Sequence, residues 1–205
     1  MDVPPPAVPS ERLDGWRQTE STVEEAFSTP VVTVSTHIVV YDETELREQI
    51  ADDTGVDLPW RFFFAGRIRL DPQRQPSGLL TSLVRRKAAD GFVDRLEDRG
   101  IEGVSERDRD ESRIGDTDGL IVTYGGAFRH RLDDAGDSAL LSLPVAALLA
   151  VWDADGDYHV AGGAYPDGPP DSGPDEVVDA VSETVDPARD HSRLRELIDG
   201  CGKIE

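Results

Sequence analysis

Residues 144–165, PVAALLAVWDADGDYHVAGGAY, decide the fold of this chain. The run from Pro144 to Trp152 is almost entirely apolar, which is typical of a central strand that is covered on both faces. The Asp and Gly residues of DADGD favour a tight turn, so Tyr158 to Tyr165 is predicted to return as the partner strand. We therefore expect this hairpin to form the centre of a sheet.

Apolar spacing predicts the remaining elements. Alternation at period two, or a β-branched and aromatic run, indicates strands at residues 31–41, 60–70, 101–109 and 113–124. Helical spacing indicates helices at about 43–53, 79–99, 175–185 and 191–201. Asp42 and Glu45 have the spacing of a capping box before the first helix. Residues 16–27 are polar with occasional apolar positions, and we assign no element to them.

This order of elements predicts an α+β fold, with a mostly antiparallel sheet flanked by helices in an α/β/α sandwich. The chain has 205 residues, of which 38% are hydrophobic, and this is enough for one sizeable core. Residues 1–12 are rich in proline and are expected to form a flexible arm. Residues 13–205 are then a single domain.

The charge balance is strongly acidic. Asp and Glu number 42 against 21 Lys and Arg, the net charge is −21, and the only lysines are Lys87 and Lys203. Repulsion between the surplus carboxylates opposes folding in dilute buffer. At about 1 M salt the Debye length falls to roughly 3 Å, so the salt screens most of this repulsion. The composition resembles that of cytoplasmic proteins from extremely halophilic archaea. The resemblance implies a salt-adapted protein surrounded by solvent cations.

The same composition restricts the partners and the compartment. Nucleic acids need a basic footprint, which this chain lacks, so we expect no nucleic-acid binding. No stretch approaches about 20 apolar residues, and no export signal is visible, so we expect a cytoplasmic protein without a membrane span. A protein partner is compatible with these features.

Four segments carry a resemblance to a known fold: LVRRKAADGFVDRLEDRGIEGVSE, GLIVTYGGAFRH, LLAVWDADGDYHVAGGAYP and SRLRELIDGC. Their order resembles the PsbP/Mog1-like α/β/α sandwich, in which a helix precedes a meander and the last helix packs back on the sheet. Residues 166–190 depart from that pattern as an insertion. The resemblance implies a fold used mainly for protein contacts and implies no catalytic residues.

Two groups of residues are candidate sites. Arg129, His130 and Arg131 follow a strand that contains Tyr124, and together the four could face an anionic ligand; the alternative is a strand end that enters solvent. Asp153, Asp155 and Asp157 alternate around a glycine as in a calcium loop, but the twelfth position is Ala164 instead of Glu, so a plain hairpin turn is the alternative.

Other polar residues favour structural roles. Arg85, Arg86 and Lys87 fan around a helix and are expected to pair with neighbouring acids. Cys201 lies on an apolar helical stripe and is expected to be a buried thiol.

The sequence identifies no function. It contains no catalytic motif, no phosphate-binding glycine loop and no dinucleotide fingerprint, and it indicates no cofactor. A non-catalytic binding or scaffolding domain is the preferred hypothesis. A small enzyme or ligand-binding protein, with a site built from scattered residues, is the alternative.

Overall fold

The computed structural model describes residues 3–28, 32–72, 77–134 and 137–203. Within them, one 3₁₀ turn, seven strands and four α-helices follow one another along the chain. In order these are η1 (Ser10–Arg12), β1 (Trp16–Ser28), β2 (Thr33–Glu43), α1 (Glu45–Thr54), β3 (Phe62–Asp71), α2 (Gly78–Asp98), β4 (Ile101–Ile114), β5 (Thr117–Asp134), β6 (Asp137–Ala154), β7 (Asp157–Pro166), α3 (Asp175–Thr184) and α4 (Pro187–Cys201).

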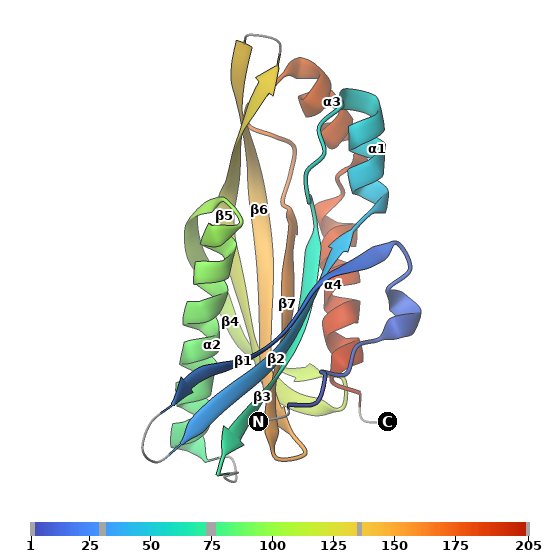
Figure 1. Ribbon diagram of the computed structural model, residues 1–205. Helices are drawn as coiled ribbons and strands as arrows, with labels where there is room; N and C mark the ends of the chain where they lie inside the picture. The colour runs from blue at the N-terminus through green and yellow to red at the C-terminus, as the bar shows by residue number, and fades with distance from the viewer. Residues whose placement is uncertain (1–2, 29–31, 73–76, 135–136, 204–205) are drawn as a thin grey trace.

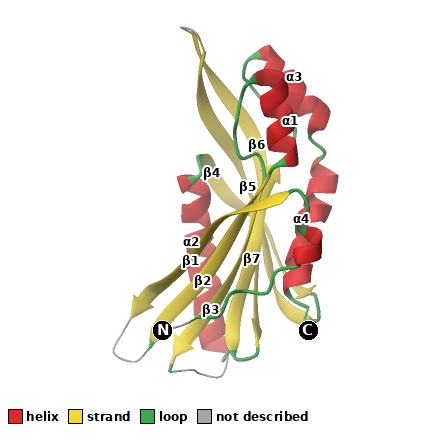
Figure 2. Ribbon diagram, turned by 45° about the vertical axis from the view of Figure 1, so that its right-hand side comes forward, coloured by secondary structure: helices red, strands yellow, loops and turns green. Residues whose placement is uncertain are grey.

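The strands form one antiparallel sheet in the order β1-β2-β3-β7-β6-β5-β4. Helices α2 and α4 lie on opposite faces of it, and α1 and α3 pack together at one end (Figures 1 and 2). The predicted α+β class, with an antiparallel sheet flanked by helices, is confirmed. None of the described helices combines the length and apolar character that a membrane span needs.

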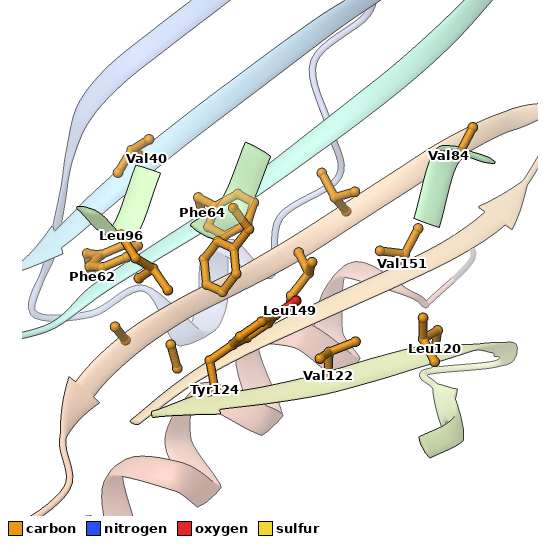
Figure 3. Close-up of a cluster of buried hydrophobic side chains, with 14 of the residues drawn as sticks. Val40, Phe62, Phe64, Val84, Leu96, Leu120, Val122, Tyr124, Leu149 and Val151 are labelled. Carbon is orange, nitrogen blue, oxygen red and sulfur yellow. The ribbon is translucent and has the colours of Figure 1, made fainter. Parts of the chain in front are cut away.

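Strand β6 divides the core into two layers, as its apolar run predicts. Leu149 and Val151 pack with Val84 and Leu96 of α2, on the face that Figure 3 shows. Leu148 lies in the second cluster, against α4. Both leucines are 1% exposed. Burial of each contributes roughly 1.5–3 kcal/mol. Strand β6 is thus an interior strand that is covered on both faces, next to the middle strand β7.

The β6–β7 hairpin closes through a two-residue turn. Asp155 has φ of +53° and Gly156 of +79°, which are the left-handed angles that such a hairpin favours. On β7, a Cβ at Gly162 would overlap the carbonyl oxygen of Leu148, and one at Gly163 would overlap that of Phe62. The paired glycines therefore allow β7 to lie close to both neighbouring strands.

A buried ionic cluster joins α4 to the ends of β2 and β3. The guanidinium of Arg61 lies 2.8 Å from the Asp190 carboxylate and 3.5 Å from that of Glu43, and Arg193 donates to the other Glu43 oxygen at 3.2 Å. The side chains of Arg61, Asp190 and Glu43 are 7%, 1% and 1% exposed. Two arginines balance two carboxylates, and this pairing offsets the desolvation of the charges.

The start of α1 differs from the predicted capping box. Asp42 is still part of β2, and the residue that precedes the helix, Thr44, makes no side-chain capping bond. The carboxylate of Glu43 instead accepts a hydrogen bond from the Leu46 amide at 3.1 Å. The capping-box prediction is wrong because β2 extends two residues beyond the predicted end of the strand.

The N-terminal segment lies against the α4 face of the sheet in the described residues. Val3 is buried, and its carbonyl oxygen lies 2.9 Å from Nδ1 of His37. Pro9 lies so close to Gly200 of α4 that a side chain at position 200 would collide with the proline ring. After this segment comes β1, an edge strand that the sequence did not indicate.

Candidate binding groove

Helix α2 lies along one face of the sheet and leaves a groove between itself and the β1–β3 part. The Ser77 hydroxyl caps the helix by accepting a hydrogen bond from the Leu80 amide at 3.3 Å. Val84, Phe92 and Leu96 then anchor it on the sheet. The groove, called the apolar groove below, has a volume of about 590 Å³.

The lining of the apolar groove is mostly hydrocarbon. The sheet supplies side chains from β2, β3, β6 and β7, and α2 supplies the opposite wall. The main apolar residues are Val34, Ile38, Phe64, Ile68, Leu70, Leu80, Leu83, Val84, Ala88, Phe92, Leu149 and Val160. Leu83 is 36% exposed at this wall, and Leu79, one turn earlier, is 87% exposed. The apolar surface therefore continues from the groove onto the exposed helix.

Gly91 lies within α2 and lines the apolar groove. A Cβ built there would meet no other atom within 4 Å. A glycine inside a helix costs roughly 1 kcal/mol relative to alanine. Packing among the described residues does not require this glycine, and its effect is to leave the groove wider.

Charged residues border the apolar groove. Glu24, Lys87, Asp90 and Asp94 contribute to its lining and are exposed, which places them at its mouth. Lys87 lies 3.7 Å from Asp90. The half-buried guanidinium of Arg95 makes no ion pair with a described residue. Within the described residues, the groove thus combines an apolar interior with a cation, Arg95, that has no ion-pair partner.

A second, polar groove of about 730 Å³ lies on the other flank of α2, against β4 and β5. One ion pair crosses it, from Arg85 of α2 to Glu111 of β4 at 2.5 Å. A second, between Arg109 and Glu106 at 2.6 Å, lies along β4 itself. The hydroxyl of Tyr124 is buried here without a hydrogen-bond partner among the described residues. Burial, and then the charge of Glu106, raise the pKa of Tyr124.

The structure separates the predicted ligand residues. Tyr124 packs in the α2-side core, whereas Arg129, His130 and Arg131 are exposed, at least five residues or roughly 17 Å further along β5. Arg129 pairs with Glu102 at 3.1 Å, and the His130 ring stacks on Phe128 at 5.9 Å. These four residues therefore do not form one compact site.

The three aspartates of the β6–β7 turn have different surroundings. Asp155 is exposed in the turn, whereas Asp157 is buried and binds the Arg69 guanidinium at 2.8 Å. No group of three or more His, Cys, Asp or Glu side chains that could hold a metal occurs in the part of the chain that the structure describes. The turn thus has the geometry of a hairpin connection.

Other sequence expectations can be compared with the structure directly. Arg85 pairs with Glu111 and Lys87 with Asp90, as expected for a basic run among acids. Cys201 is buried in the α4 stripe, where desolvation raises its pKa to about 12. Sequence reasoning overlooked Gly91 and Arg95, although a glycine inside a predicted helix was a visible signal.

Comparisons with known proteins give one match. No curated protein and no solved structure is significantly similar to the chain, so the resemblance to the PsbP/Mog1-like fold is not confirmed. A family model described as "Domain of unknown function (DUF6517)" matches residues 5–202. Because this match spans nearly the whole chain, the protein belongs to the DUF6517 family.

Proposed function

We propose that this domain is a non-catalytic binding protein and that the apolar groove holds a single-chain amphiphile with an anionic head group. The observation that carries the proposal is the groove itself, with about 590 Å³ of space lined mainly by hydrocarbon. Pockets for small molecules have volumes of about 300–1,000 Å³ and bind mainly through apolar contacts. The exposed Leu79 and Leu83 extend the same surface beyond the groove.

The charged border favours an anionic head group. Arg95 lines the groove and has no ion pair among the described residues. A carboxylate at the end of a hydrocarbon chain would form an ion pair with this guanidinium, and the chain would cover the apolar lining. Glu24 and Asp94, which are exposed at the mouth, would oppose an anion placed further along the groove. These charges define one preferred orientation for the ligand.

Gly91 supports an occupant of this kind. Its missing side chain leaves open space on the α2 wall at a cost in helix stability. A bound hydrocarbon chain would fill that space and contribute about 0.8 kcal/mol for each buried methylene. The glycine is then explained by the ligand that passes it.

Decanoate and decanol, which share a chain and differ in charge, are suitable probes. Binding is measured by displacement of the fluorescent anion anilinonaphthalene sulfonate in about 2 M KCl. Gly91→Phe should abolish binding of both probes, and Gly91→Ala, the matched control, should retain it. Arg95→Gln should weaken decanoate at least tenfold and leave decanol unchanged. Equal binding to wild type and Gly91→Phe would refute the apolar groove as the binding site. Equal effects of Arg95→Gln on both probes would refute a preference for an anionic head group.

We also propose that the domain works in the cytoplasm of a cell with molar salt. The net charge of −21 and the presence of only two lysines support a surface that solvent cations must screen. If a protein partner covered Leu79 and Leu83, the domain would act as a scaffold. This binding would be revealed by a mass increase in solution that Leu79→Ser removes and decanoate does not.

A further inference from the structure

The polar groove on the second flank of α2 contains a buried hydroxyl that the fold itself does not satisfy. Tyr124 is 3% exposed, and its hydroxyl has no hydrogen-bond partner among the described residues. The ring packs edge-on against Phe92 with centroids 5.6 Å apart, and the residue lines the groove. An unsatisfied buried hydroxyl costs about 1–3 kcal/mol, so a ligand that forms a hydrogen bond with it has a position prepared for it.

The charges around the hydroxyl fall into paired and unpaired groups. Arg85 and Arg109 are each held by a glutamate of β4, through the two ion pairs described above. Arg85 also has a buried Nε without a hydrogen-bond partner in the described chain. The remaining lining charges come from α2: Arg86 and Asp94 make no ion pair with a described residue, and Asp90 meets only Lys87.

The uncommitted charges have opposite signs and a defined spacing. Arg86 and Asp94 are eight residues apart on α2, which corresponds to a rise of roughly 12 Å along the helix. A simple anion would form an ion pair with Arg86 but would be repelled by Asp90 and Asp94. A simple cation would satisfy the Tyr124 hydroxyl but would leave Arg86 and the Arg85 Nε without an acceptor. Only a molecule with both charges complements the whole lining.

We propose that the polar groove binds a small zwitterion with an extended body. Its ammonium group donates a hydrogen bond to the Tyr124 hydroxyl and faces Asp90 and Asp94. Its carboxylate faces Arg85 and Arg86 at the other end of the groove. This site lies on the opposite flank of α2 from the apolar groove, and Asp90 and Asp94 border both grooves.

Titration calorimetry in about 2 M KCl tests the proposal with 6-aminohexanoate, hexanoate and hexylammonium. The Gly91→Phe background keeps the hydrocarbon probes out of the apolar groove. The zwitterion should bind at least tenfold more tightly than either single-charge probe. Equal affinity for hexanoate would show a plain anion site and would overturn the proposal, as would the absence of binding by all three.

Tyr124→Phe supplies a second readout that does not need the ligand. Removing an unsatisfied hydroxyl should leave the thermal midpoint of the ligand-free protein unchanged or raise it, while binding of 6-aminohexanoate falls at least tenfold. Arg129→Gln, the control on the same strand, should change neither. A lowered midpoint in Tyr124→Phe, together with unchanged binding, would show that the hydroxyl serves the fold and would overturn the proposal.

Discussion

Replacing Arg61 with methionine removes the central cation of the buried ionic cluster and keeps a side chain of similar length. Glu43 still has Arg193 at 3.2 Å. Among the described residues, the cation that Asp190 retains is Arg189, which lies 3.9 Å away and is 62% exposed. The variant therefore leaves a carboxylate that is 1% exposed almost without compensation. Breaking such a pair from one side costs about 3–5 kcal/mol.

The pH dependence of this cost has a definite sign. Burial raises the pKa of Asp190, and Arg61 opposes that rise. Without Arg61 the folded-state pKa increases further above its unfolded value, so the folded variant binds the proton more tightly than the unfolded chain does. Its stability is then lost as pH rises through the folded-state pKa. We expect the difference from wild type to shrink when the pH is lowered from about 7 towards 5.

Urea unfolding in about 2 M KCl, followed by circular dichroism, measures the difference. The double variant Arg61→Met/Asp190→Leu removes both charges and leaves the pair Glu43–Arg193 intact. Because well-packed apolar side chains often replace a buried ion pair without loss, the double variant should be at least about 2 kcal/mol more stable than the single one. A single-variant cost below about 1 kcal/mol, or a double variant that is no better, would refute the reasoning.

Four further outcomes are expected. The thermal midpoint should rise steeply with KCl and the protein should unfold below a few tenths molar, so equal midpoints at low and high salt would contradict the salt-adapted surface. Leu149→Ala should cost about 2–5 kcal/mol in urea unfolding, whereas the exposed Asp175→Ala should cost a few tenths at most; equal losses would contradict the buried, interior position of β6. Calorimetry in about 2 M KCl should detect no saturable calcium binding at Asp153–Asp157, and stoichiometric micromolar binding would make the turn a metal site. Cys201, with a pKa of about 12, should resist thiol reagents near pH 8 until low salt unfolds the protein, and prompt labelling of the folded form would contradict its burial.

Local apolar patterns were sufficient to predict most of the fold. Strand β6 is apolar from Pro144 to Trp152 because both faces are covered there, and the α4 stripe of Leu194, Leu197, Ile198 and Cys201 is buried as its spacing indicates. Strand β1 was missed because an edge strand with mostly exposed residues has no apolar alternation. The segment is a strand because it pairs with β2, and Trp16 at its start lies opposite Glu43 at the end of β2. Such pairing cannot be read from β1 alone.

The candidate site was less accessible to sequence reasoning. Tyr124 was named, but with Arg129 to Arg131, because neighbours in sequence suggest neighbours in space. Along a strand that assumption fails, since five residues extend roughly 17 Å. Both grooves arise from the width of a sheet that one helix does not cover, and this width depends on contacts between distant segments. Gly91 is visible in the sequence as a glycine inside a predicted helix, but its role can be interpreted only once the groove is known.

The strand order also has a consequence for how the chain folds. Strands β1–β3 and β4–β7 are two meanders in which each strand pairs with its successor, and only β3 and β7 join them. The paired residues of that seam are 90 to 102 positions apart in the chain, so forming it closes a far longer loop than any hairpin does. Because local contacts form before distant ones, we expect each meander to form early and the union of the two to be the slow step of folding. Gly163 lies in this seam against the Phe62 carbonyl, which places a residue with no side chain at the position where the two halves must meet most closely.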